Sequence, residues 1–211
     1  MLKFLMRLSV SVLTAVLLLN ILPVHGEEEI YQNAVRLHVL AHSDAQEDQE
    51  LKYQVRDALL VQCRDLFGTC QNAAQAQQTA QQNLDVLTRT AERVIAENGY
   101  DYPCSVCIGT EHYPTREYGE MVFPAGDYIS LRVLIGDAAG KNWWCVLFPP
   151  LCLDAASDTY AGGGVEMDRK TGDMMYQAGF TPGQVQILTE AKNQKTVIRF
   201  KLLEVFSGLF S

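Results

Sequence analysis

Hydrophobic and polar residues alternate along several stretches of the chain, which is the pattern of a β-strand that buries one face. In the first of them, Val35, Leu37 and Val39 share one side of residues 35–41. The same period marks residues 102–109, 128–136 and 195–206. Residues 143–148 are apolar on both sides, so we expect this strand in the middle of a sheet, with cover on each face.

Between Leu51 and about Leu66, apolar residues recur every three or four positions, as they do in an amphipathic helix. We expect this helix to begin after Ser43-Asp44, where Asp44 and Glu47 have the spacing of a capping box, and to end before Gly68. Asp48 and Lys52 form a favourable i,i+4 charge pair on the polar side of this helix. That side is either an ordinary solvated face or a partner-contact surface, and its polar residues are Asp48, Gln49, Lys52, Arg56 and Asp57.

Two more helices follow from the same period. Residues 71–98 predict one long helix that ends at Asn98-Gly99. Thr181-Pro182-Gly183-Gln184, with Gln184 at the capping-box position, marks the start of a short helix to about residue 193. Residues 154–179 have no clear period, so we expect them to be irregular. The order of elements predicts one α+β domain over residues 27–211, with a mixed or antiparallel sheet packed against two or three helices.

The N-terminus has the layout of a secretory signal peptide. Lys3 and Arg7 precede the apolar run 8–22, Pro23 ends that run, and residues 24–26 allow a cut ahead of Glu27. The run is shorter than the roughly 20 residues of a membrane-spanning helix. We therefore expect residues 1–26 to be a signal peptide and the protein to be exported, with an uncleaved membrane anchor as the alternative.

Charge narrows the classes of partner. The full chain carries a net charge of −8, and removal of Lys3 and Arg7 with the signal peptide makes the remainder more acidic. An acidic protein repels nucleic-acid phosphates and anionic lipid head groups, so we expect no nucleic-acid partner and membrane contact only through the N-terminal segment. The sequence contains no Gly-rich phosphate loop and no Gly-x-Ser-x-Gly or His-Glu-x-x-His motif, and we expect no cofactor.

All six cysteines follow the signal peptide. An even number in an exported chain suggests disulfides, although sequence alone does not choose the pairing, and free buried thiols are the alternative. Cys145 and Cys152 are the best-placed pair, because Pro149-Pro150 between them can turn the chain back. Cys104 and Cys107 match the redox pattern Cys-x-x-Cys, but on a strand their sulfurs face opposite ways, with Cα atoms about 10 Å apart.

Histidines and a serine near the first strand suggest two kinds of site, a metal site and a hydrolytic triad. His38 and His42 lie four positions apart, but on a strand that is about 13 Å, too far for one zinc ion, so we expect no metal site. His38, Ser43 and Asp44 contain the residue types of a hydrolytic triad, although a helix cap explains Ser43-Asp44 more simply. Trp143 and Trp144 point to opposite sides of their strand, so one of them is available as an interface anchor.

These signatures together resemble the stage II sporulation protein R family of spore-forming bacteria. His42 departs from the family, which tends to carry Asn there. The matching residues cover most of the chain after the signal peptide: Arg36-Leu37-His38-Val39-Leu40-Ala41, Ser43-Asp44, Asp48-Gln49, Lys52, Val55-Arg56-Asp57, Tyr118-Gly119, Phe123-Pro124-Ala125-Gly126, Tyr128, Leu131-Arg132-Val133, Ile135-Gly136 and the run 142–152.

The resemblance implies a secreted signalling protein, made in the forespore and exported into the space between the forespore and mother-cell membranes. There it activates a membrane-embedded aspartic protease of the mother cell, which cleaves the precursor of a sporulation sigma factor. In this interpretation the chain is not an enzyme. The alternatives are an exported hydrolase or thiol oxidoreductase that uses His38, Ser43 and Asp44 or Cys104 and Cys107, and a structural envelope protein.

The residues expected to contact the partner are polar and aromatic residues of these matching stretches. Alanine at Lys52 or Arg56 is expected to abolish signalling without lowering the melting temperature. The full set is His38, Ser43, Asp44, Asp48, Gln49, Lys52, Arg56, Asn142 and one of Trp143 and Trp144.

Overall fold

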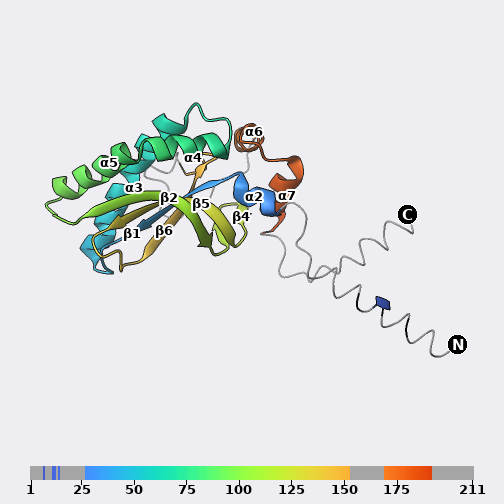
Figure 1. The fold of residues 1–211 in the computed structure, drawn as a ribbon, viewed down its shortest axis with the longest axis horizontal. Helices are drawn as coiled ribbons and strands as arrows, with labels where there is room; N and C mark the ends of the chain where they lie inside the picture. Colours follow the sequence, from blue (N-terminus) through green and yellow to red (C-terminus); the bar gives the residue numbers. More distant parts are fainter. Residues whose placement is uncertain (1–6, 8–10, 13, 15–26, 153–168, 192–211) are drawn as a thin grey trace.

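The computed structural model describes residues 27–152 and 169–191, with residues 7, 11, 12 and 14 near the N-terminus (Figure 1). The remainder of the signal peptide and the predicted strand 195–206 lie outside the described residues. The helices are α2 (Glu27–Gln32), α3 (Gln46–Phe67), α4 (Ala73–Gln82), α5 (Leu84–Glu97), α6 (Arg169–Gln177) and α7 (Pro182–Glu190). The strands are β1 (Val35–Leu40), β2 (Cys104–Tyr113), β3 (Arg116–Tyr118), β4 (Met121–Phe123), β5 (Gly126–Ile135) and β6 (Asn142–Phe148).

The main sheet has the strand order β2-β5-β1-β6. β1 runs parallel to β5 and antiparallel to β6, and β2 is antiparallel to β5. The sheet is therefore mixed, and the predicted α+β class is confirmed. β3 and β4 form a separate short hairpin. None of the helices in the described part of the chain has the length and apolar character that crossing a bilayer requires.

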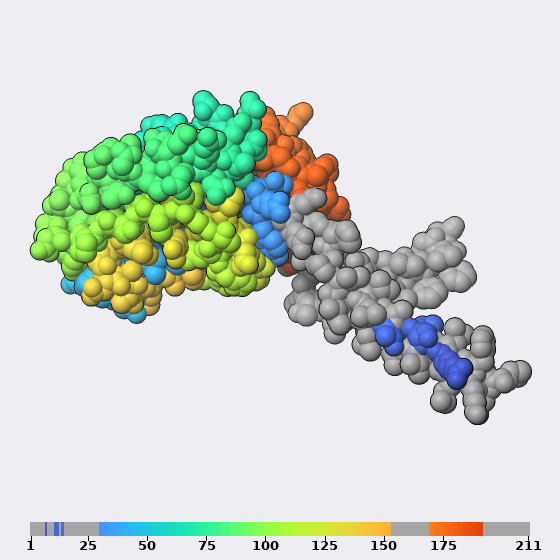
Figure 2. All heavy atoms as spheres, viewed as in Figure 1, coloured from blue at the N-terminus to red at the C-terminus, as the bar shows by residue number. Residues whose placement is uncertain are grey.

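The two faces of the sheet have different cover. Val35, Leu37 and Val39 of β1 are fully buried on the face against which α3, α4 and α5 pack, and Figure 1 shows α4 and α5 along one side of the sheet. We call the opposite face, which carries Arg36 and His38, the open face. The β3–β4 hairpin and α2 lie at one end of the sheet, where α2 contacts β5. Figure 2 shows β2, in lime, at the molecular surface below α5.

The long helix predicted over residues 71–98 is two helices, so that prediction is wrong. The break is at Asn83, whose side chain donates to the Thr79 carbonyl at 2.8 Å and whose backbone N–H donates to Ala80 at 3.1 Å. An asparagine that bonds to nearby backbone carbonyls competes with the regular helical ladder. Asn98 and Gly99 end α5 as predicted, Gly99 with φ 83°.

The apolar strand 143–148 does not lie in the middle of the sheet. β6 is an edge strand beside β1, although residues 145–148 are buried. The reason is the segment that follows, because the N–H of Val146 donates to Cys152 Sγ at 3.3 Å. The chain after β6 thus turns back along this edge strand and covers its apolar residues. The apolar pattern had predicted that a neighbouring strand would cover them.

Two short helices lie near the C-terminal end of the described chain. α7 begins as predicted, with Thr181 and Gln184 in a capping box. Residues 169–177 were expected to be irregular and instead form α6. The buried residues of α6 are Thr171 and Met175, which are too few for a clear hydrophobic period.

Candidate functional site

The loop after β1 and the loop before β6 are joined by backbone hydrogen bonds. Gly140 N donates to the Ala41 carbonyl at 3.0 Å, and Ala139 N donates to the His42 carbonyl at 3.2 Å. The approach is so close that a Cβ atom at Gly140 would overlap the carbonyl oxygen of Ser43. These two loops are called the loop pair, residues 41–45 and 136–141.

Asp44 belongs to this loop pair and does not cap α3. Its Oδ1 accepts from the backbone N–H of Lys141 at 2.7 Å. The N-cap residue of α3 is Ala45, which makes no side-chain cap bond. The predicted capping box of Asp44 and Glu47 is therefore wrong, because a long-range partner takes the carboxylate that a local cap requires.

Polar residues of α3 bind the loop pair to the helix. Ser43 Oγ donates to Asp48 Oδ2 at 2.5 Å, and Gln49 Nε2 donates to the Ser43 carbonyl at 2.8 Å. Lys52 Nζ donates to Gln49 Oε1 at 2.6 Å and to the Lys141 carbonyl at 3.0 Å. The chain of bonds runs from one loop through α3 to the other, so these side chains fix the end of the molecule where the two loops meet.

Burial changes the interpretation of this helix face. Lys52 is 1% exposed and Asp48 is 5% exposed, so for these two residues the solvated-face alternative is wrong. Burial, with the nearby charge of Arg56, lowers the pKa of Lys52. Loss of a buried ammonium that satisfies two acceptors destabilises a fold. Alanine at Lys52 is therefore expected to lower the melting temperature, contrary to the sequence-based expectation.

His38 is held at both ring nitrogens on the open face. Nδ1 lies 2.8 Å from Glu111 Oε1, and Nε2 lies 2.9 Å from Asn142 Oδ1. Glu111 Oε2 accepts from Ser130 Oγ at 2.7 Å, and Ser130 Oγ lies 2.7 Å from the Tyr113 hydroxyl. One polar network thus crosses all four strands of the main sheet. We call it the His38 network: Asn142, His38, Glu111, Ser130 and Tyr113.

Sequence reasoning missed three members of this network. Glu111 and Tyr113 lie beyond residue 109, where the strand was expected to end, and β2 continues to Tyr113. The fully buried Ser130 lies within the strand that was predicted from its apolar residues. The signal for Glu111 and Tyr113 was present, because both continue the two-residue period from Cys107 and Gly109.

The residues of the hypothetical hydrolytic triad have other partners. The Oγ of Ser43 donates to Asp48, while both ring nitrogens of His38 face Glu111 and Asn142. Within residues 27–152 and 169–191, the His, Cys, Asp and Glu side chains form no group of three or more that could hold a metal ion. His42 instead accepts from Asp137 N at 3.0 Å. The structure thus does not bring His38, Ser43 and Asp44 together as a hydrolytic triad.

Cys104 and Cys107 are free thiols on β2, three residues apart on a strand, so their side chains face opposite ways. Burial raises the pKa of Cys104 to about 12 from its ordinary value of 9.0. Reactive cysteines of redox proteins have lowered pKa values, because the thiolate is the nucleophile. The geometry and the pKa both argue against the thiol oxidoreductase alternative.

We expect the thiols of Cys63 and Cys104 to resist alkylation in the folded protein. Burial raises the pKa of each to about 12, so near pH 8 each has about a thousandfold fewer thiolates than in the unfolded chain. Between pH 9 and 12 the unfolded chain loses these protons first, so stability falls as the pH rises through this window. Iodoacetamide labelling with peptide mass spectrometry measures the rates, and equal rates for Cys104 with and without urea would contradict the expectation.

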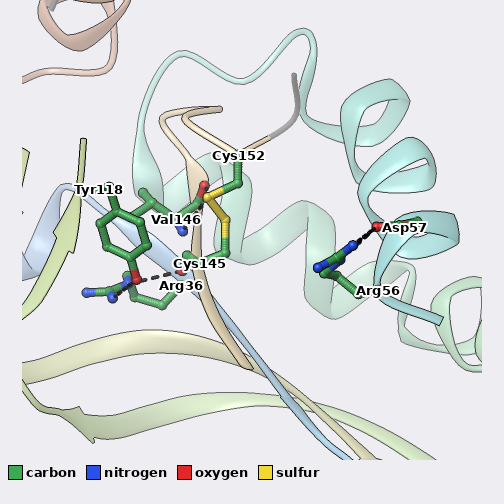
Figure 3. The surroundings of a disulfide bond; sticks show 7 residues. All are labelled: Arg36, Arg56, Asp57, Tyr118, Cys145, Val146 and Cys152. Atoms are coloured by element: carbon green, nitrogen blue, oxygen red, sulfur yellow. Dashed lines mark hydrogen bonds and ion pairs between the residues drawn. A yellow bond between two sulfur atoms is a disulfide. The ribbon is translucent and has the colours of Figure 1, made fainter. Parts of the chain in front are cut away.

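The predicted disulfide between Cys145 and Cys152 is present, and Figure 3 shows it beside Val146 and Arg36. Their Cα atoms are 6.3 Å apart, and the residues lie seven positions apart in the chain. The bridge holds the segment that turns back along β6.

Reduction of this bridge is expected to lower the free energy of unfolding by about 2–3 kcal/mol, because a short closed loop restricts the unfolded chain. Guanidinium unfolding with and without a phosphine reductant measures the difference. The double variant C145S/C152S should unfold at the same guanidinium concentration as the reduced protein, and the reductant should not change that midpoint. The control variant C107S lacks a free thiol and should lose as much stability on reduction as the wild type does. Equal unfolding midpoints for the oxidised and the reduced wild type would contradict this prediction.

The tryptophans lie on opposite faces of the edge strand β6, as predicted. Trp143 lies on the helix side, where the Arg56 guanidinium is 4.9 Å from its ring centroid and 4.8 Å from that of Tyr53. Arg56 also pairs with Asp57 at 2.6 Å, as Figure 3 shows. Tyr53 is 41% exposed. Of the predicted contact residues, those at the surface of this edge are Arg56, Asn142, Trp143 and Trp144.

Arg36 lies at the covered end of the open face. It is fully buried, and its guanidinium lies 4.4 to 5.4 Å from the ring centroids of four aromatic residues. Nη2 donates to the Tyr118 hydroxyl at 2.6 Å and Nε donates to the Cys145 carbonyl at 3.1 Å. Arg36 thereby joins the β3–β4 hairpin to the main sheet. The four rings belong to Tyr113, Tyr118, Phe123 and Tyr128.

Comparison with known proteins assigns the family. The family model described as stage II sporulation protein R matches residues 31–158. The chain belongs to this family. Stage II sporulation protein R of Bacillus subtilis (strain 168) is 30% identical over 190 residues, which cover 86% of this chain and 84% of the relative. No solved structure matches the chain.

The matched range contains every feature described above for the main sheet. It includes the loop pair, the His38 network, the disulfide and the edge strand β6. It ends before α6 and α7. The family resemblance noted from the sequence is thus confirmed over the part of the chain that builds the candidate site.

Proposed function

We propose that this protein is an exported sporulation signal that acts in the space between the forespore and mother-cell membranes. There it binds a membrane-embedded aspartic protease of the mother cell and activates it, and the protease then processes a sigma-factor precursor. Family membership is the observation that carries the proposal. The Cys145–Cys152 disulfide supports a site of action outside the cytoplasm.

The structure supports a division of labour among the predicted contact residues. The buried Asp48 and Lys52 hold the loop pair in place, whereas Arg56 and Trp143 offer a cation and an aromatic ring at the edge of the sheet. Arginine and tryptophan are the residues that most often dominate interface energies. Binding activates the protease if the signal has a higher affinity for the active state than for the resting state.

A reconstituted reporter strain tests the proposal. It expresses the membrane protease and a tagged sigma-factor precursor, and cleavage is followed by immunoblotting. Cleavage should require the full chain and be lost when residues 1–26 are deleted. Arg56→Ala should reduce cleavage at least tenfold, whereas Gln54→Ala, on the exposed side of the same helix, should not. Cleavage that proceeds without the chain, or with the leaderless chain, would refute the proposed function.

A further inference from the structure

Two arginines at the exposed part of the open face have no acidic partner within the described residues. The two exposed arginines of α5, by contrast, pair with neighbouring acids: Arg89 with Asp85 at 2.8 Å and Arg93 with Glu97 at 3.0 Å. Arg132 of β5 is exposed, and no described side chain bonds to it. Arg116 of β3 has no ion-pair partner among the described residues. In a chain with a net charge of −8, these unpaired cations need an explanation.

The Arg116 guanidinium lies over an aromatic ring and retains an unused donor. It lies 3.9 Å from the ring centroid of Trp144. Its Nε is buried and has no hydrogen-bond partner, and the same holds for Nη1 of the fully buried Arg36. A buried donor without an acceptor costs about 1–3 kcal/mol. The β3–β4 hairpin covers Arg36, so of these two arginines the half-buried Arg116 is the one beside Trp144 at the exposed part of the face.

The sheet surface beneath these arginines is held by hydrogen bonds and is partly exposed. Cys107, Arg132, His38 and Trp144 lie in register across the four strands, and His38 is held by the His38 network. The His38 and Trp144 rings are 5.2 Å apart. Gly109 is exposed, and a Cβ atom added there would contact nothing within 4 Å. The sheet surface at Gly109, on the same face as Cys107 and Arg132, is therefore uncovered by described residues.

From these observations we propose that the open face around Arg116, Arg132 and Trp144 is the docking surface for an acidic segment of the partner protease. The segment's carboxylates pair with the two guanidinium groups, and Trp144 supplies the apolar contact. Arginine suits this role because its planar guanidinium can bind a carboxylate through two parallel hydrogen bonds. The inference rests on the proposed function, since it names the chemistry of the partner at the same edge strand.

Charge reversal at the exposed arginine tests the surface. The reporter strain measures precursor cleavage with the full chain carrying Arg132→Glu, Arg132→Lys or the matched control Arg93→Glu from α5. Arg132→Glu should reduce cleavage at least tenfold, Arg132→Lys should retain a substantial part, and Arg93→Glu should match wild type. Arg116→Gln, which removes the charge but keeps a polar side chain, should also reduce cleavage. Unfolding midpoints of the purified variants exclude loss of fold.

The outcomes separate this inference from the proposed function. If wild type activates cleavage and folded Arg132→Glu does so equally well, the docking surface is refuted and the proposed function stands. If Arg93→Glu is as impaired as Arg132→Glu, the effect is general electrostatics and the inference also fails. If light scattering shows that Arg132→Glu dissolves a dimer of wild type, the acidic occupant is a second copy of the chain and the inference is wrong. If wild type itself gives no cleavage, the proposed function fails.

Discussion

Gly140→Ala is expected to lower the free energy of unfolding by about 2–4 kcal/mol. A Cβ atom at this position overlaps the backbone carbonyl oxygen of Ser43 and also meets the Cβ of Ala41 at 3.0 Å. Backbone cannot swing aside as a flexible side chain can, so the two loops must separate. Separation stretches the hydrogen bond from Gly140 N to the Ala41 carbonyl. Urea unfolding followed by circular dichroism measures the loss.

Gly109→Ala is the matched control for this experiment. Gly109 lies on β2 of the main sheet, and an added Cβ atom there would contact nothing within 4 Å. Its substitution should change the free energy of unfolding by no more than about 0.5 kcal/mol. If the two glycine variants were equally stable, the loop pair would not have the close approach described here.

Arg36→Ala should have an effect of similar or greater size, a loss of about 3–5 kcal/mol. The change removes the bonds to the Tyr118 hydroxyl and the Cys145 carbonyl and leaves a cavity among four aromatic rings. Arg36→Met fills most of that volume without a charge, and a hydrophobic replacement of a buried ion often costs little. We therefore expect Arg36→Met to lose less than half as much stability as Arg36→Ala.

Arg132→Ala provides the reference for an exposed arginine of the same sheet. It should alter the free energy of unfolding by no more than about 0.5 kcal/mol, because its side chain is exposed and has no described partner to lose. Chemical denaturation of the three arginine variants under one set of conditions gives the comparison. Equal stabilities for Arg36→Ala and Arg132→Ala would mean that Arg36 does not hold the β3–β4 hairpin on the sheet.

The sequence predicted the elements whose signals are local. The alternation in residues 35–40 and the capping box at Thr181 each depend on neighbours along the chain, and both are confirmed. The errors came from contacts between distant segments. Asp44 resembles a helix cap until Lys141 is known to lie beside it, and β6 resembles a central strand until the disulfide segment is known to cover its edge.

The same limit applies to the candidate site. The composition of the helix surface placed Lys52 among solvated residues, because sequence alone did not show that the β5–β6 loop covers it. The opposite orientation of Trp143 and Trp144 follows from the strand period and is confirmed by their contacts with Arg56 and His38. Glu111 was missed because its role depends on a strand register that only the fold supplies.

A purified reconstitution tests the proposed mode of action most directly. The oxidised chain is added to proteoliposomes that hold the membrane protease, with the sigma-factor precursor on the catalytic side and the chain on the other. The precursor should remain intact with the chain alone, be cleaved slowly by the protease alone, and be cleaved at least tenfold faster with both. Cleavage of the precursor by the chain in the absence of the protease, or a protease rate that the chain leaves unchanged, would contradict the account.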